Sequence, residues 1–174
     1  MGRCPPRRLG RKYLNKNKKM PTEITTELIK ELRESTGISV MQCKRALEEA
    51  GGDMKKALAI LKKNSSDIAL KKADRELGAG YIEAYVHGGG RIGAMIELDC
   101  ETDFVAKNEI FRNLAKEIAM QVAATNPTDL AALLEEPFIK DPGTTINKLI
   151  EEAIQKTGER IKIGNFARFE LPQK

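Results

Sequence analysis

The sequence has few of the residues that most often carry chemistry. It contains three cysteines, one histidine and 5% aromatic residues. The cysteines are odd in number, lie far apart and form no Cys-x-x-Cys pair, which argues against a zinc site and favours a reducing compartment. No apolar run approaches the roughly 18–20 residues of a membrane span, and no secretory signal is recognisable. The 174 residues, 41% of them hydrophobic, suffice for one medium domain or for a small and a larger one.

The excess of positive charge is confined to the start of the chain. Eight of the 30 Lys and Arg side chains, and none of the 25 acids, lie in residues 1–19, so the remainder carries 22 basic and 25 acidic groups, a net charge of −3. The overall charge of +5 is therefore no evidence for a nucleic-acid-binding domain. We expect residues 1–21 to be a disordered basic leader. It would be an organelle-targeting segment, a nucleic-acid-binding tail, or the product of a start codon assigned upstream of Met20.

Three short helices are predicted to follow this leader. Apolar residues recur at helical spacing, and Gly37 and Gly51 mark two of the helix ends. Each helix begins at a residue that favours helix N-termini: Thr25, Ser39 (which forms a capping box with Gln42) and Asp53. We expect a three-helix bundle over residues 22–66, too small to be stable alone, and a helical connector over residues 67–79.

The second half of the sequence changes to the alternation that is typical of strands. Ile82, Ala84 and Val86 alternate before a turn at residues 87–91, and alternate residues from Ile92 to Cys100 are apolar after it. This pattern predicts a β-hairpin.

Helices and one more strand are predicted after the hairpin. A helix is expected from about Val105 to Thr125, followed by a short one before Pro137 and a third with apolar residues from Ile146 to Ile154. The first of these is expected to bury Ile110, Phe111, Leu114, Ile118 and Val122. A last strand is expected over residues 161–171, formed by Ile161, Ile163, Ala167, Phe169 and Leu171, with a bulge at Gly164-Asn165. Strands grouped apart from helices predict an α+β core over residues 80–174, an antiparallel sheet covered by helices.

No cluster of residues in the sequence has the residue types and spacing of a catalytic or metal-binding site. Gly88-Gly89-Gly90 precedes a strand and lacks a following Lys-Ser or Lys-Thr, so it predicts a hairpin turn and not a phosphate loop. His87 has no nucleophile close to it in the sequence. Cys43 shares a predicted core stripe with Val40, and Cys100 belongs to the apolar set of the hairpin, which is expected to face inward on both strands. We therefore expect neither an enzyme nor a metal or cofactor site.

Two apolar residues stand where a buried position is not expected. With Cys43 as the core direction, Met41 lies about 160° away on the second helix, on its charged face. Phe104 follows Asp103 at the corner between the hairpin and the next helix. An isolated exposed Met is common, and Phe104 could be a staple that packs its own helix onto the sheet, with Asp103 capping that helix. The alternative is a contact surface for a partner.

Three segments carry a recognisable family pattern. They are residues 29–37 continuing to 43–53 (IKELRESTG, CKRAL, EAGGD), residues 97–108 (ELDCETDFVAKN), and residues 144–171 with KTGERIKI. Together they cover roughly residues 22–172 and resemble the elongation factor Ts family. The resemblance implies that the bundle is of the ubiquitin-associated type. The chain has room for one core unit, as in the short members of the family, which use a dimer.

The resemblance also implies a function. Members of the family are guanine nucleotide exchange factors that bind elongation factor Tu with GDP, displace magnesium and promote GDP release. The segment that displaces magnesium would be Thr102, Asp103, Phe104 and Val105. Val40 and Met41 would dock the bundle, although Ile38-Ser39-Val40-Met41-Gln42 departs from the family's Ala-Gly-Met-Met-Asp. The resemblance further implies a homodimer in the bacterial cytoplasm or in an organelle matrix. It implies no membrane, cofactor or specific nucleic acid.

Three other functions stay open at this point. The chain could be a plain interaction module that binds a helix or peptide without affecting nucleotides, which an inert, buried Phe104 would favour. It could act on RNA or the ribosome through residues 1–19, in which case binding would weaken steeply with salt. An enzyme would need a pocket around His87 or a cysteine.

Overall fold

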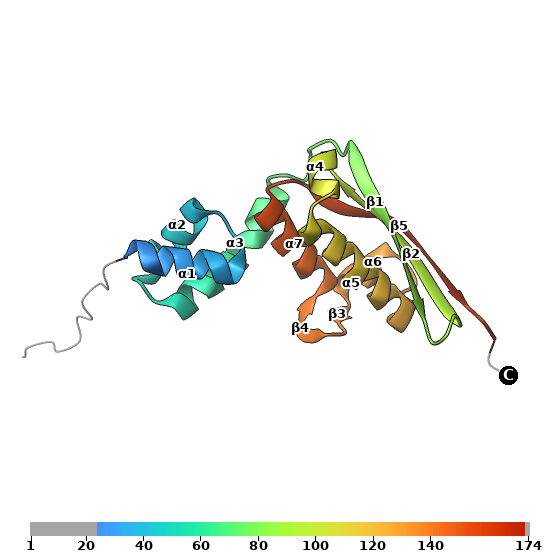
Figure 1. Cartoon of the computed structure of the whole chain (residues 1–174). Helices are drawn as coiled ribbons and strands as arrows, with labels where there is room; N and C mark the ends of the chain where they lie inside the picture. Colours follow the sequence, from blue (N-terminus) through green and yellow to red (C-terminus); the bar gives the residue numbers. More distant parts are fainter. Residues whose placement is uncertain (1–23, 173–174) are drawn as a thin grey trace, which may run out of the picture.

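Residues 24–172 are described by the computed structural model, in which a helical bundle is joined to an α+β domain (Figure 1). The bundle contains α1 (Thr26–Thr36), α2 (Val40–Ala50) and α3 (Met54–Leu70). The leader expected over residues 1–21 and Cys4 lie outside the described residues. Within residues 24–172, no helix is long and apolar enough to cross a membrane.

The three helices start where the sequence predicts. Thr25 Oγ1 accepts a hydrogen bond from Leu28 N at 3.4 Å, and Asp53 Oδ1 accepts from Lys55 N at 3.0 Å. Ser39 Oγ likewise accepts from Gln42 N at 3.4 Å. The side chain of Gln42 does not return this bond, because its Oε1 accepts from Nε2 of Gln155 at 3.2 Å. Half of the predicted capping box is therefore used to tie the bundle to the α+β domain.

The predicted helical connector is wrong as a separate element. Its first residues, 67–70, continue α3, and turns at residues 71–74 end the helix before the first strand. The long α3 packs against α7 (Ile146–Thr157) of the α+β domain, where Ser66 Oγ donates to Glu151 Oε2 at 2.6 Å. A bundle that is marginal alone thus gains a second surface to pack on, as its small size requires.

The α+β domain contains a three-stranded antiparallel sheet covered on one side by helices, which confirms the predicted fold class (Figure 1). Its strands are β1 (Ala79–His87), β2 (Ile92–Cys100) and β5 (Ile161–Glu170), in the order β1-β2-β5. The predicted glycine turn joins β1 to β2, with positive φ at all three glycines. The remaining elements are α4 (Asp103–Ala106), α5 (Glu109–Thr125), α6 (Leu130–Glu135), and the unpredicted pair β3 (Pro137–Phe138) and β4 (Asp141–Thr145).

The long helix predicted after the hairpin is in fact two helices. The first ends at Ala106, with Lys107 as its C-cap, and Asn108 caps the second, since its Oδ1 accepts from Ile110 N at 2.8 Å. The first, α4, has only four residues. The second, α5, buries Phe111, Leu114, Ile118 and Val122 as expected, whereas Ile110 is partly exposed. The break leaves α4 free to point in a direction of its own.

The prediction for the buried face of β1 is also wrong. Alternate residues of β2 from Ala94 to Cys100 are buried against the helices, as predicted. Tyr81 and Tyr85 of β1 pair with Leu98 and Ala94 and pack on the same core, so Ile82, Ala84 and Val86 face outward. Antiparallel partners lie on the same side of a sheet, and the tyrosines bury their rings while keeping their hydroxyls near water.

The bulge in β5 is confirmed, but its consequence for the faces of the strand was not predicted. Ile163 pairs with Leu98 and Asn165 with Glu97, which leaves Gly164 without a partner in β2. A Cβ at Gly164 would lie 2.7 Å from Asp99 Oδ2, so a larger residue at this position would require the Asp99 side chain to move. The extra residue reverses the alternation. Ile161 and Ile163 are buried, whereas Ala167, Phe169 and Leu171 are exposed.

Candidate partner-binding site

Residues 100–105, here called the Phe104 corner, connect the end of β2 to α4 at one end of the α+β domain (Figure 1). In a four-residue helix with 100° per residue, only one side can face the core. Val105 and Ala106 take that side and are buried, and Phe104 on the opposite side is 80% exposed. The alternative in which Phe104 packs its own helix onto the sheet is therefore wrong. Val105, in contrast, is an anchor of the corner in the free chain and not an accessible residue.

The other two residues of the predicted segment are exposed but play different local roles. Thr102, not Asp103, is the N-cap of α4, and its side chain makes no capping bond to that helix. Asp103 is the first residue of α4, where the helix dipole favours a negative charge. Asp103 and Phe104 therefore stand side by side at the surface, an acid next to a large apolar ring.

Two carboxylates hold the corner in place. Glu159, in the turn after α7, accepts from Thr102 N at 3.0 Å and from Thr102 Oγ1 at 2.6 Å. Glu101 accepts from Arg160 N at 2.5 Å and from Arg75 Nη1 at 3.1 Å. The guanidinium of Arg160 donates in turn to the carbonyl oxygen of Arg75. Residues 101–102 are thus bonded both to the turn after α7 and to the segment that leads out of the bundle.

The surroundings of Glu101 shift its pKa. Partial burial raises the pKa, but the hydrogen bonds from Arg160 N–H and from the Arg75 guanidinium outweigh it, and the net pKa lies below the ordinary value. A carboxyl with a lowered pKa in the folded state stabilises the fold above its unfolded pKa. That contribution is lost as the pH falls through the folded pKa.

Replacing Glu101 by Gln should therefore change the pH dependence of stability. We expect Glu101→Gln to lower the free energy of unfolding by about 1 kcal/mol at pH 7, because the charge on a side chain that accepts from Arg75 and Arg160 is lost. The difference from wild type should shrink as the pH falls from about 5 towards 3. Urea unfolding followed by circular dichroism at several pH values measures the free-energy difference and its pH dependence. A difference that stays constant with pH would contradict the assigned pKa shift.

The two predicted docking residues on the bundle are also exposed. Met41 is 59% exposed, as its position on the charged face of α2 predicts. Val40 was placed by its spacing on the core stripe with Cys43, yet it is 47% exposed, because it is the first residue of α2 and lies beyond the bundle core. In Figure 1, α2 and α4 both lie towards the upper edge of the molecule, one on each part.

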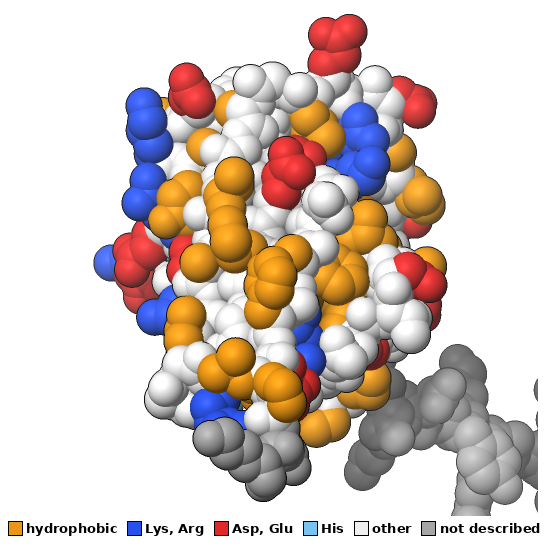
Figure 2. Space-filling model, turned by 90° about the vertical axis from the view of Figure 1, so that its right-hand side faces the viewer, with side chains coloured by type: hydrophobic (Ala, Val, Ile, Leu, Met, Phe, Trp, Pro, Cys, Tyr) orange, Lys and Arg blue, Asp and Glu red, His pale blue; other side chains and the backbone are white. Residues whose placement is uncertain are grey.

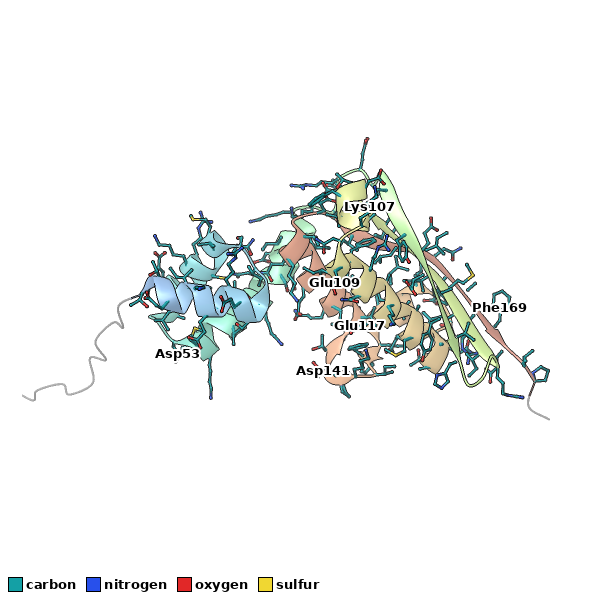
Figure 3. The ribbon with its side chains drawn as sticks, viewed as in Figure 1. Asp53, Lys107, Glu109, Glu117, Asp141 and Phe169 are labelled. Atoms are coloured by element: carbon teal, nitrogen blue, oxygen red, sulfur yellow. The ribbon has the colours of Figure 1, made fainter. Side chains whose placement is uncertain are left out.

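A second apolar surface covers the side of the sheet that faces away from the helices. In Figure 2 hydrophobic side chains gather over the middle of this side, and Figure 3 shows Phe169 pointing outward from it. Cross-strand pairs align Ala84, Met95 and Ala167 in one row and Val86, Gly93 and Phe169 in the next. We call this surface the outer sheet face; it consists of Ile82, Ala84, Val86, Met95, Ala167, Phe169 and Leu171, of which the larger side chains are 46–68% exposed.

The groups considered for chemistry are placed as structural residues. Cys43 and Cys100 are fully buried, and burial, with a smaller effect from the charge of Glu159, raises the pKa of the Cys100 thiol. His87 Nδ1 is bonded to the hydroxyl of Tyr85 at 3.1 Å, beside a hollow lined by apolar side chains of α5 and β2. Among residues 24–172, no group of three or more His, Cys, Asp or Glu side chains could hold a metal ion.

Sequence reasoning missed the residues that hold the site. Arg75 lies in a segment predicted as helix, and Glu159 lies in a quoted motif without a role assigned to it. Nothing in their spacing connects them to residues 101–102, which are 26 and 57 residues away in the sequence. The outer sheet face was missed because its residues on β1 were taken as the inward set and no face was assigned to its residues on β5. The bulge at Gly164 was the available signal, since a bulge reverses alternation.

The fold and these surfaces define a class of protein: an α+β domain with an attached helical bundle that presents apolar side chains suited to contact with other proteins. A model of the family Elongation factor TS matches residues 101–174. An elongation factor Ts from Carboxydothermus hydrogenoformans is 42% identical over 85% of this chain and 89% of its own length. Those from Caldanaerobacter subterraneus subsp. tengcongensis and Desulforamulus reducens are 41% and 40% identical over 84% and 86% of the chain, and over 96% and 89% of their own lengths. The chain belongs to the elongation factor Ts family, and thus to the translation elongation factors.

One difference from these relatives is visible in the lengths. The match with the Carboxydothermus hydrogenoformans protein spans 193 positions, more than the 174 residues of the whole chain. That relative therefore carries residues inside the matched region that this chain lacks.

Proposed function

We propose that this protein is the guanine nucleotide exchange factor for elongation factor Tu, and that it acts without covalent chemistry or a cofactor. It binds elongation factor Tu with GDP, displaces the magnesium ion and promotes GDP release, so that GTP can bind. The observation that supports this proposal most strongly is Phe104, a large apolar side chain that is 80% exposed on an anchored corner. Membership in the elongation factor Ts family supplies the partner.

The residues divide into two contact regions in this proposal. Asp103 and Phe104 enter the nucleotide-binding domain of elongation factor Tu near the magnesium site, while Thr102 and Val105 hold them in place. Val40 and Met41 dock the bundle against the same domain. Their exposure at the start of α2 supports this role, since apolar side chains at the surface gain free energy when a partner covers them.

The free energies of ring burial and of nucleotide binding indicate how the exchange works. A phenylalanine buries on the order of 150–250 Å², worth roughly 4–6 kcal/mol before entropy and imperfect fit are subtracted. A nanomolar nucleotide complex is worth about 12 kcal/mol, so the insertion of one ring does not cancel nucleotide binding. It contributes part of a coupling free energy, because the ring binds the magnesium-free form better than the loaded form. The coupling is reciprocal, and GTP binding therefore releases the exchange factor.

Release of fluorescent GDP from elongation factor Tu tests the proposal. Unlabelled GDP is present in excess, and the proposed exchange factor is added at increasing concentration. We expect the release rate to rise with the concentration of the exchange factor and then to level off. The maximal rate should exceed the unassisted rate by up to about 100-fold, since typical coupling free energies reach about 3 kcal/mol. Binding without acceleration would instead favour the plain interaction module. Activity that disappears when residues 1–19 are removed, and that weakens steeply with salt, would favour the RNA- or ribosome-associated protein.

We also propose that the protein works as a homodimer in the bacterial cytoplasm. The outer sheet face supports the dimer, because a contiguous apolar surface on one side of a sheet is the kind of surface that pairs of subunits cover. In this proposal the two sheets pack face to face and leave the Phe104 corner of each subunit free. The bacterial relatives support the location.

A further inference from the structure

Thr102 is bonded in an unusual way for the N-cap residue of a helix. An N-cap threonine ordinarily uses its side-chain oxygen to accept from the backbone of its own helix. In α4 this bond is missing, and the Thr102 hydroxyl donates to Glu159 Oε1 at 2.6 Å. The backbone N–H of the same residue donates to Glu159 Oε2 at 3.0 Å. One carboxylate therefore fixes both the backbone and the side chain of the residue two positions before Phe104.

Glu159 is itself held in a fixed position. It follows Gly158, which ends α7 with a φ of 78°, and its N–H donates to Thr157 Oγ1 at 3.4 Å. Lys72 Nζ donates to the carbonyl oxygen of Gly158. The next residue, Arg160, donates its N–H to Glu101. The Glu159 carboxylate of the turn thus accepts from Thr102 of the corner, and the Glu101 carboxylate of the corner accepts from Arg160 of the turn.

We infer that Glu159 is a positioning residue for Phe104: its carboxylate holds Thr102 so that the ring is presented to the partner in one orientation. This inference rests on the proposed function for its consequence in exchange. A ring on a four-residue helix has little helical stability of its own to keep it in place. Restricting its motion before binding lowers the entropy that is lost on binding. Glu159 lies two residues after the end of α7, and its carboxylate faces Thr102.

The motion of the ring can be measured without any partner. The chain contains no tryptophan, so Phe104→Trp provides a single indole whose anisotropy decay reports local motion at position 104. In this background we expect Glu159→Ala to add a fast component on the nanosecond timescale. Glu159→Gln should add much less, because its carbonyl oxygen accepts one bond and its amide can donate to the Thr102 hydroxyl. Glu135→Ala, an exposed acid at the end of α6, is the matched control. An anisotropy decay that is unchanged by Glu159→Ala would overturn the inference.

A double-mutant cycle separates positioning from direct contact and from general stability. We expect Glu159→Ala to slow assisted GDP release by about 5- to 20-fold when Phe104 is present, as part of the loss of two charge-assisted hydrogen bonds. In the Phe104→Ala background the same change should have almost no further effect, and Glu159→Gln should restore most of the activity. Equal losses in both backgrounds would mean that Glu159 acts independently of the ring and would overturn the inference.

The two measurements also distinguish failure of the inference from failure of the proposed function. If the wild-type protein does not accelerate GDP release, the exchange function is wrong, yet the anisotropy decay still decides whether Glu159 positions the side chain at residue 104. Circular dichroism and urea unfolding of each variant show whether it is folded under the assay conditions.

Discussion

Phe104→Ala should remove most of the acceleration of GDP release while leaving the protein folded. We expect the maximal release rate to fall by about 30-fold or more, because truncating an aromatic residue at the centre of an interface typically costs at least 2 kcal/mol. The ring is 80% exposed in the free protein, so the free energy of unfolding should change by only about 0.5 kcal/mol. Stopped-flow release of fluorescent GDP, over a range of exchange-factor concentrations, measures the maximal rate and the concentration at half-maximum separately.

The control for this experiment is another exposed apolar residue outside the proposed contacts. Ile139 is 42% exposed in the turn between β3 and β4, and Ile139→Ala should leave both exchange parameters unchanged. Met41→Ala should mainly raise the concentration needed for half-maximal exchange, because docking of the bundle is proposed to contribute to binding and not to displacement of magnesium. A maximal rate that survives Phe104→Ala would move the displacement step to other residues and leave the exchange function itself intact.

Met95→Glu should convert the proposed dimer into a monomer. Met95 is central on the outer sheet face, where it lies between Ala84 and Ala167 in one cross-strand row. In a face-to-face dimer the substitution buries two new carboxylates, and each unpaired buried charge costs several kcal/mol. We expect dimerisation to weaken at least about 1,000-fold, which corresponds to roughly 4 kcal/mol. Light scattering at tens of micromolar should give twice the 19.3 kDa chain mass for wild type and the single mass for the variant.

The same charge placed elsewhere provides the comparison. Ile139→Glu adds a carboxylate at a site of similar exposure that is not on the outer sheet face, and it should leave the dimer intact. The monomer fold should tolerate Met95→Glu, because the side chain is 46% exposed and faces away from the helices. A wild-type protein that is monomeric at this concentration would contradict the dimer. A dimer that persists in Met95→Glu would place the interface on another surface.

If both predictions hold, the two apolar surfaces have separate duties. The outer sheet face would join two subunits, and the Phe104 corner and the start of α2 would contact elongation factor Tu. Exchange by a monomeric Met95→Glu variant would then show whether one subunit is sufficient. The two surfaces are connected through β2: Met95 lies on the outer sheet face, and Cys100 at the end of the same strand begins the corner.

Much of the architecture follows from the sequence because its signals are local. The caps at Thr25, Ser39 and Asp53 are bonds between residues two or three positions apart, so composition and spacing alone predict them. The glycine turn and the buried stripe of α5 are local for the same reason. The exposure of Met41 also follows from helical periodicity, since Cys43 assigns the opposite side of α2 to the core.

Other features were decided by contacts between residues that lie far apart. The inward face of β1 depends on its register with β2, which brings Tyr81 and Tyr85 over the core and turns the more hydrophobic Ile82 and Val86 outward. The faces of β5 depend on the bulge at Gly164, where a side chain would collide with Asp99 of the neighbouring strand. Hydrophobicity alone assigns both sets wrongly, because it does not include the surface that a second subunit could cover.

The amino-acid sequence by itself thus determined that this chain is an α+β protein with a small helical bundle, that it resembles the elongation factor Ts family, and that Phe104 is out of place. The tertiary structure decided that Phe104 is exposed and how it is held there. The reason is physical: a helix of four residues has no fixed direction of its own. That direction comes from two carboxylates, Glu101 and Glu159, whose partners lie 26 to 59 residues away along the chain.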